Sequence, residues 1–275
     1  MKALGKIISA IFLVVTLGLV VYLSVNLKSG NGYSIQIIAM EGNVHLTKEQ
    51  YLSYANLLDR NNYASLSLQV IKDRIEKHPY VERADVRYDG NGQVSISITE
   101  KSFIAILLND DNQFIVTDKL QVLPVFDQTK KIDYPIIANT NVNGAVQPLA
   151  SMRNNFDVVT AAKIISSVKL LNPELYDSFS SIDLENGGDI ILNLSSVNYP
   201  IRIGRGSEIR KIVYLNNLWN YLKGKEINQY LDYVDLRYGG HVYLGILESS
   251  NGKAETNSNE GLPDRQAGLP NGKQG

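Results

Sequence analysis

The uncharged apolar segment from Ile7 to Leu27 constrains this chain more than any other feature. It reads IISAIFLVVTLGLVVYLSVNL and contains no Asp, Glu, Lys, Arg or His. A helix of this length rises about 30 Å, which matches the hydrocarbon core of a bilayer. A cleaved signal peptide is the alternative, but the apolar run is longer than usual for one and no small-x-small cleavage site follows it. The segment therefore predicts one uncleaved transmembrane helix.

Lysines on both sides of this helix indicate its orientation. Lys2 and Lys6 precede it and Lys28 follows it. The N-terminal tail, residues 1–6, is too short to form a domain and carries two of these charges, so the positive-inside rule keeps it in the cytoplasm. We therefore expect a single-pass membrane protein. After a Gly/Asn/Ser linker at residues 28–32, the rest of the chain is expected outside the cytoplasm.

Residues 33–100 have the pattern of a small α+β domain. A strand is predicted at 33–42, and Thr47 with Gln50 forms a capping box that begins a helix. A second helix begins near Ser67 and ends before Pro79. The alternating segments VERADVRY and QVSISITE, joined by the turn DGNG, predict two further strands. The order β-α-α-β-β predicts a domain with one three-stranded sheet.

Residues 101–248 predict a larger mixed β-sheet domain with flanking helices. Short strand patterns follow one another, and a helix is expected from about 155 to 171. Ser207 is expected to cap a later helix with a broad apolar face formed by Ile209, Ile212, Val213, Leu218, Trp219 and Leu222. From residue 249 to 275 the chain has almost nothing to bury and is predicted to be disordered.

The final strand pattern, YVDLRYGGHVYLG from Tyr233 to Gly245, contains two consecutive glycines. A two-residue hairpin turn at Gly239-Gly240 would pair Asp235 with Leu244, which sorts polar and apolar side chains poorly. We therefore favour one bent strand or a bulge, and the hairpin remains the alternative. That strand would keep six apolar side chains on one face: Val234, Leu236, Tyr238, Val242, Leu244 and Ile246. A final strand is often a sheet edge, whose free backbone groups can pair with another strand.

Composition and spacing argue against several other classes of function. The chain has no Cys, which excludes disulfides, zinc thiolates and a Cys nucleophile. Its net charge is −1 and no basic stripe is present, so nucleic acid is not an expected partner. The GRG at 204–206 lacks the third glycine of a dinucleotide site, because Ile209 stands there. No Gly-x-Ser-x-Gly nucleophile motif occurs. We expect no catalytic residue, no cofactor and no small-molecule substrate.

The three histidines, His45, His78 and His241, lie on remote segments. They have neither the spacing nor the neighbouring Cys of a metal site, so no metal ligand is predicted. Lys77 and His78 are interpreted as positive charges that suit the C-terminal dipole of the preceding helix.

Several local sequences, in order, resemble one family. IIAMEGN and HPYVERADVRYDGNGQVSISITE are similar to the POTRA (polypeptide-transport-associated) module. Pro79, Val81, Ala84, Val86 and the closing Glu100 fit the form of that module found in the FtsQ/DivIB family of bacterial cell-division proteins. YPII near 135, IRIGRGSEIRK at 201–211 and YVDLRY at 233–238 follow in that family's order. The resemblance covers the chain from Leu4 to about Leu247.

This resemblance implies a non-enzymatic scaffold of the division machinery in the bacterial inner membrane, at the septum, with its C-terminal domains in the periplasm. It implies FtsB/DivIC-like and FtsL-like bitopic partners and a part in controlling septal peptidoglycan synthesis by the septal synthase complex. In that family the terminal β region accepts a strand of the partner. Carried over to this sequence, the partner-binding residues are Arg237, Tyr238, Gly240 and Ile246, with Arg205 as a basic partner for an acidic residue.

Two alternatives remain open from the residues alone. One is a POTRA-bearing component of secretion or outer-membrane assembly, although such proteins usually carry several POTRA repeats or a β-barrel. The other is a membrane-anchored cell-wall enzyme, because carboxylates are plentiful and no motif selects a catalytic pair among them.

Overall fold

The computed structural model describes residues 2–26, 35–142 and 144–247, without the side chains of residues 2–10, 24–26, 64 and 65. The segment expected to cross a membrane falls in helix α1 (Lys2–Asn26), apart from Leu27. Leu27, the expected linker at 28–32 and the expected disordered tail at 249–275 lie outside the described residues. Within the described part of the chain, no helix is both long enough and apolar enough to span a membrane.

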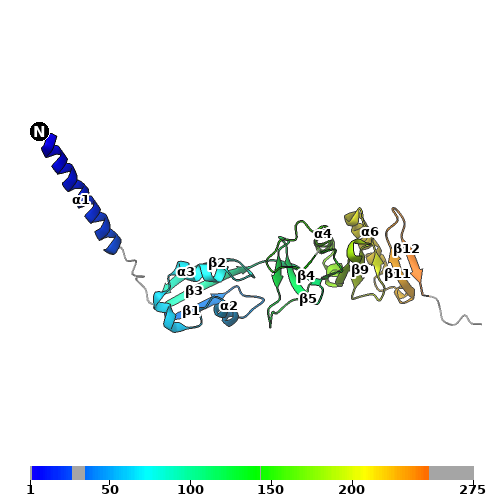
Figure 1. The fold of residues 1–275 in the computed structure, drawn as a ribbon. Helices are drawn as coiled ribbons and strands as arrows, with labels where there is room; N and C mark the ends of the chain where they lie inside the picture. Colours follow the sequence, from blue (N-terminus) through cyan, green and yellow to red (C-terminus); the bar gives the residue numbers. More distant parts are fainter. Residues whose placement is uncertain (1, 27–34, 143, 248–275) are drawn as a thin grey trace, which may run out of the picture.

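The small domain (residues 35–100) has the expected order of elements (Figure 1). Its elements are β1 (Ile37–Glu41), α2 (Lys48–Tyr54), the 3-10 helix η1 (Arg60–Ser65), α3 (Leu68–Glu76), β2 (Val81–Gly90) and β3 (Gln93–Glu100). Thr47 and Gln50 form the expected capping box of α2. In the sheet, β3 lies between β1, to which it is parallel, and β2, to which it is antiparallel. The predicted β-α-α-β-β domain is confirmed.

The large domain (residues 101–247) is built on a nine-stranded mixed sheet in the order β12-β11-β10-β9-β8-β7-β4-β5-β6. Its strands are β4 (Phe103–Asn109), β5 (Asn112–Thr117), β6 (Val122–Pro124), β7 (Ile136–Ala138), β8 (Phe179–Asp183), β9 (Ile191–Leu194), β10 (Ile201–Arg202), β11 (Leu231–Asp235) and β12 (Tyr243–Ile246). Its helices are α4 (Phe156–Leu171), α5 (Pro173–Asp177) and α6 (Glu208–Leu222), with 3-10 turns η2 (Glu185–Gly187) and η3 (Glu226–Tyr230). The prediction of a larger mixed sheet with flanking helices is confirmed.

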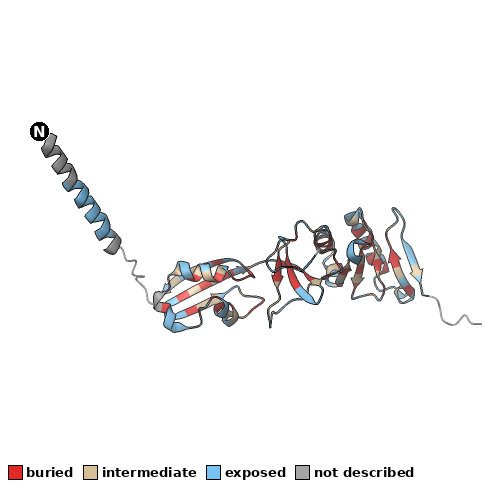
Figure 2. Cartoon of the chain, in the orientation of Figure 1, coloured by how far each residue is buried: buried red, intermediate tan, exposed pale blue. Residues whose placement is uncertain are grey.

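Helices α4 and α6 supply the core that covers one face of this sheet. Leu107 of β4, Ile182 of β8 and Val234 of β11 share one hydrophobic cluster with Ile164 of α4 and Ile212 of α6. Each of these side chains is almost fully buried, and Figure 2 shows the buried residues recurring along the strands and helices. The main core of the large domain therefore lies between the helices and this face.

The opposite face is buried at β4, β5 and β6, where it meets the small domain. Ile106, Ile115 and Leu123 belong to the same hydrophobic cluster as Tyr51 and Tyr80 of the small domain. Strand β4 is therefore buried on both faces, which explains why its sequence FIAILLN shows no alternation of polar and apolar residues. The two domains share a continuous core at this end of the sheet.

Glu100, the last residue of β3, organises the polar part of this junction. Its carboxylate accepts hydrogen bonds from the backbone nitrogen of Val44 at 2.7 Å and the hydroxyl of Tyr51 at 2.6 Å, and it contacts Nδ1 of His45. Nε2 of His45 lies 3.3 Å from the hydroxyl of Tyr134 in the large domain. Burial raises the pKa of Glu100, but the hydrogen bonds to His45, Tyr51 and the backbone outweigh it, so the pKa lies below its ordinary value.

His78 does not have the role that we expected. Its side chain is buried among the rings of Tyr51, Tyr80 and Phe126. Its Nδ1 accepts a hydrogen bond from the backbone nitrogen of Tyr80 at 3.1 Å. Burial lowers the pKa of His78 to about 4, so the ring is neutral near pH 7. The residue therefore packs the junction and does not present a positive charge to the end of α3.

The beginning of α6 also differs from the prediction. Ser207 occupies the N-cap position, but with a left-handed φ of 57° its side chain makes no capping hydrogen bond. The carboxylate of Glu208 accepts one from the backbone nitrogen of Gly206 at 2.6 Å instead. Ile209 and Val213 of the predicted apolar face are partly exposed. The buried side chains of α6 are Lys211, Ile212, Leu215, Trp219 and Leu222.

Candidate partner-binding edge

The stretch from Tyr233 to Gly245 forms a hairpin, so the single bent strand that we favoured is wrong. Strands β11 and β12 are antiparallel, with Val234 opposite Leu244 and Asp235 opposite Tyr243. This register differs by one residue from the two-residue turn, and the connection is the longer segment 236–242. The shift removes the sorting problem, because Val234 and Leu244 now share one face while Asp235 and Tyr243 share the other.

The two glycines form a tight turn inside this connection. The backbone nitrogen of His241 donates to the carbonyl oxygen of Tyr238 at 3.2 Å. Gly240 has a φ of +79°, the left-handed value that the third position of a type II turn requires. Gly240 therefore shapes the loop that carries Tyr238, and any other residue there would strain the turn.

Arg237 ties this loop to the sheet. Its guanidinium forms ion pairs with Asp235 at 2.6 Å and with Asp189 at 2.7 Å. Asp189 lies in the turn that precedes β9, so the second pair links the loop to another connection of the sheet. Hydrogen bonds from Arg237 hold the pKa of Asp235 below its ordinary value, and those to Asp235 and Asp189 raise the pKa of Arg237. The backbone of Gly204 lies close to the side chain of Arg237, because a Cβ on Gly204 would lie 2.8 Å from Cγ of Arg237.

Exposed apolar side chains gather on β12 and its loop. The rings of Tyr238 and Tyr243 meet edge to face, with centroids 5.2 Å apart. Ile246 is 66% exposed and Leu244 is 38% exposed, although the latter pairs with a buried residue of β11. We call this surface the edge patch; it comprises Tyr238, Val242, Tyr243, Leu244, Ile246 and Leu247.

Strand β12 stands at the end of the sheet, and no other described strand pairs with its outer side. Figure 1 shows β12 beside β11 at the end of the large domain farthest from the small domain. The strand YLGI contains no proline and no charged residue, which are common devices that stop an edge from pairing. The charged residues Asp235 and Arg237 lie on β11 and in the loop. The site thus offers unpaired backbone groups beside apolar side chains, which suits strand addition.

Arg205 makes its contacts with residues outside the edge patch. Its guanidinium forms an ion pair with Asp157 of α4 at 2.8 Å, and its Nε donates to the carbonyl oxygen of Gly188 at 2.5 Å. About a quarter of the side chain remains exposed. Arg205 therefore holds the turn before β9 against α4, while Arg237 holds the same turn from the other side.

Two kinds of site residue were missing from the sequence prediction. Tyr243 and Leu244 lie in the quoted strand, and a hairpin register one residue longer would have placed them at the edge. Asp189 carries no local signal, because it meets Arg237 across 48 residues of sequence. Of the predicted residues, Arg237, Tyr238 and Gly240 come together in one loop.

The described residues offer no arrangement of three or more His, Cys, Asp or Glu side chains that could hold a metal ion. His45 and His78 both lie in the junction beside Tyr80, while His241 lies in the hairpin loop beside Tyr243.

Known proteins are similar to this chain in sequence. The family model described as POTRA domain, FtsQ-type, matches residues 33–101. Cell division protein FtsQ of Geotalea daltonii is 22% identical over 199 residues, which cover 72% of this chain and 70% of that protein. Cell division protein FtsQ of Syntrophotalea carbinolica is 21% identical over 203 residues, covering 74% and 70%. Cell division protein DivIB of Clostridium tetani is 24% identical over 199 residues, covering 70% and 71%.

The matches to FtsQ and DivIB proteins extend beyond the POTRA region into the large domain, since each covers at least 70% of this chain. The element order of the small domain and the large mixed sheet agree with the resemblance drawn from the short sequence motifs. These matches support the resemblance of this chain to the FtsQ/DivIB family of bacterial cell-division proteins.

Proposed function

We propose that this protein is a non-enzymatic, single-pass membrane scaffold of the bacterial divisome. In this proposal its domains lie in the periplasm at the septum, bind FtsB/DivIC-like and FtsL-like bitopic proteins, and help to control the septal synthase complex that makes peptidoglycan. The similarity to FtsQ and DivIB proteins supports the division role. The unpaired outer side of β12 is the observation that carries the binding role.

The N-terminal segment is proposed as the anchor. Ile7 to Leu27 contains no charged residue, and the described large apolar side chains of α1, from Ile11 to Leu23, are exposed. A lipid bilayer would bury these apolar side chains, which would otherwise be exposed to water. Anchoring confines the two domains to a layer beside the membrane and so raises their effective concentration for other anchored proteins.

Strand addition at β12 is proposed as the mode of binding. A partner strand would take up the backbone hydrogen bonds on the outer side of β12, and its alternate side chains would contact the two faces of the extended sheet. Leu244 and Ile246 offer apolar contacts on the face that α6 covers further along the sheet. Tyr238 and Tyr243 extend the contact toward the loop.

The two arginines have separate parts in this proposal. Arg237 would act by holding the loop that carries Tyr238, through its ion pairs with Asp235 and Asp189. Arg205 would meet an acidic partner residue with the exposed quarter of its side chain, while its pair with Asp157 keeps it in place.

The proposal is tested by measuring how tightly the full chain, held in lipid nanodiscs, binds the ectodomain of an FtsB-like protein. Ile246→Glu places a charge on the edge patch, and Tyr238→Ala removes an exposed ring. We expect each to weaken capture about tenfold or more, because interface centres concentrate the binding energy. The affinity is measured by titration with a fluorescently labelled partner.

Leu170→Glu is the matched control, since Leu170 of α4 is 87% exposed and lies outside the edge patch. It should leave capture unchanged. Circular dichroism shows whether each variant is folded. Equal capture by the control and by both edge variants would refute the assignment of β12 as the binding edge.

A further inference from the structure

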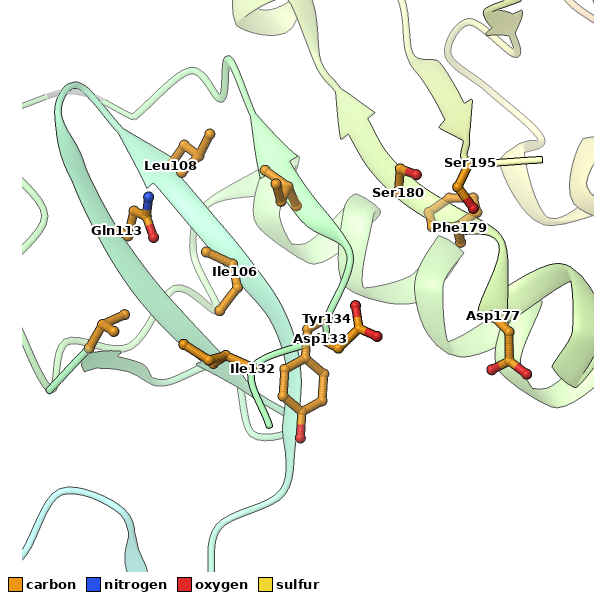
Figure 3. A pocket seen from close by; sticks show the side chains of 12 residues that line it. Ile106, Leu108, Gln113, Ile132, Asp133, Tyr134, Asp177, Phe179, Ser180 and Ser195 are labelled. Atoms are coloured by element: carbon orange, nitrogen blue, oxygen red, sulfur yellow. The ribbon is translucent and has the colours of Figure 1, made fainter. Parts of the chain in front are cut away.

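A groove of about 560 Å³ lies on the face of the large sheet that α4 and α6 leave uncovered. Apolar side chains line part of it, among them Ile106 of β4 and Ile136 of β7, which stand opposite each other in the parallel pair, and Gln113, Ser180 and Ser195 add polar groups. Figure 3 shows the groove between the segment that leads into β7 and the end of α5. Ile132 and Ile136 are 38% and 36% exposed at this surface. The volume lies within the usual range of binding sites.

Two carboxylates stand on the rim of this groove. Asp133 lies on the segment that leads into β7, and Asp177 ends α5 on the other side (Figure 3). Neither carboxylate has an ion-pair or hydrogen-bond partner among the described residues, whereas Arg205 and Arg237 are both paired with carboxylates. Burial raises the pKa of Tyr176, and the negative charges of Asp177 and Asp133 raise it further. The groove thus combines exposed aliphatic side chains with two unpaired carboxylates.

The junction between the domains holds one wall of the groove in place. Tyr134 lines it, and its hydroxyl lies 3.3 Å from Nε2 of His45 in the small domain. His45 in turn contacts the carboxylate of Glu100. Ile106 also belongs to the core that the two domains share. The groove is therefore a preorganised surface whose shape depends on the packing of both domains.

We propose that this groove docks a short polypeptide segment that carries aliphatic side chains and a Lys or Arg, provided by a second partner. Aliphatic side chains would cover Ile132 and Ile136, and the basic residue would pair with Asp133 and Asp177. Charge complementarity selects this occupant, because an acidic segment would bring like charges together, which disfavours binding.

This site is separate from the β12 edge. Strand β8, which borders the groove, stands four places from β12 in the sheet. At about 4.8 Å per strand, that is a separation of roughly 19 Å. One added strand at β12 cannot fill the groove, so both sites can be occupied together.

Methyl NMR of the full chain in phosphatidylcholine nanodiscs tests the proposal, with isoleucine methyl groups labelled. The probe is a short synthetic peptide of alternating leucine and lysine, and its control replaces each lysine with glutamate. We expect the lysine peptide to shift the methyl signals of Ile132 and Ile136, and the glutamate peptide to leave them in place. Ile246 reports the β12 edge in the same spectra.

Charge variants complete the test. Asp133→Lys with Asp177→Lys should weaken binding of the lysine peptide about tenfold. The milder pair Asp133→Asn and Asp177→Asn should weaken it less, and it keeps the test valid if the first pair is unfolded. The control pair, Asp85→Lys with Asp111→Lys, changes two exposed carboxylates outside the groove and should leave binding unchanged.

Several results would overturn the proposal. These are equal binding of both peptides, shifts confined to Ile246, the same affinity in the Asn pair as in the unmodified chain, and concentration-dependent shifts without peptide, which would indicate a second copy of this chain. Loss of FtsB-like capture by Ile246→Glu does not depend on the groove, so the two proposals fail independently.

Discussion

The two edge strands of the nine-stranded sheet differ in whether the backbone groups on their outer sides are hydrogen-bonded. At β6 the chain covers its own edge: Val122 donates to the carbonyl of Ala150 at 3.0 Å and accepts from the backbone nitrogen of Leu149 at 2.7 Å. Pro124 ends this strand without an N–H group, and its carbonyl accepts from the hydroxyl of Tyr80 at 2.9 Å. At β12 no described segment pairs with the outer side.

This difference follows from what each edge packs against. Strand β6 is buried on both faces, by the main core of the large domain and by the core shared with the small domain. An unpaired polar backbone group in such surroundings costs free energy, so the chain supplies its partners. The outer side of strand β12 faces water, so its backbone groups can hydrogen-bond to water or to another chain. The closed edge contributes to folding, and the open edge is suited to binding.

The largest expected effect comes from one substitution made at both edges. Leu123 of β6 is fully buried, and Leu244 of β12 is 38% exposed. Leu123→Ala should lower the free energy of unfolding by about 2–5 kcal/mol, because it leaves a cavity. Leu244→Ala should lower it by less than about 1 kcal/mol and weaken partner capture instead. Urea unfolding measures both variants, and similar losses of stability would break the comparison.

Acid should destabilise the closed end of the sheet before the open end. The pKa of His78 is lowered to about 4 in the folded protein, from an ordinary value of 6.5. As the pH falls from 6.5 to about 4, the unfolded chain therefore binds a proton that the folded protein excludes, and stability falls by about 3 kcal/mol. Protonation of Glu100, whose pKa is also lowered, adds to the loss at still lower pH.

Urea unfolding midpoints at several pH values measure this loss. His78→Gln is the control, because glutamine offers an acceptor to the backbone of Tyr80 and does not titrate. The variant should show a flatter stability profile between pH 6.5 and 4 than the unmodified protein. Identical slopes would contradict the buried, neutral state of His78.

A smaller effect is expected from Asp189→Asn at the open edge. This substitution removes one of the two ion pairs of Arg237 and leaves the pair with Asp235. Amide hydrogen exchange should become faster in residues 236–242, because the loop loses its link to the turn before β9. The midpoint of thermal unfolding should change little, since exposed pairs contribute little to stability. Unchanged exchange would show that Asp235 alone holds the loop.

The smallest effect is expected from removal of residues 249–275. This polar segment has few apolar side chains to bury, so its loss should change neither the unfolding midpoint nor capture of the FtsB-like partner. Titration of the shortened chain with the labelled partner measures this. Weaker capture would show that the segment contributes to the open edge.

The sequence was most informative where local patterns decide the structure. The capping box at Thr47 and Gln50 and the alternating strand 93–100 placed elements that the fold contains. It was misleading at Gly239-Gly240, because parity within one strand cannot distinguish a straight strand from a hairpin whose loop length is unknown. It also misjudged His78, since a helix end that faces solvent and one that faces another domain look alike in sequence.

The sequence by itself therefore determined the order of elements in the small domain, the larger mixed sheet that follows, and the resemblance to one family. Each of these rests on short-range periodicity, on caps and turns, or on short sequence motifs in a fixed order along the chain. Only the tertiary structure decided which strand is the open edge, how Asp189 secures the loop of Arg237, and where Asp133 and Asp177 face a common groove. Those features join residues far apart in the chain, and strand order and register, which bring them together, are set by packing and not by local sequence.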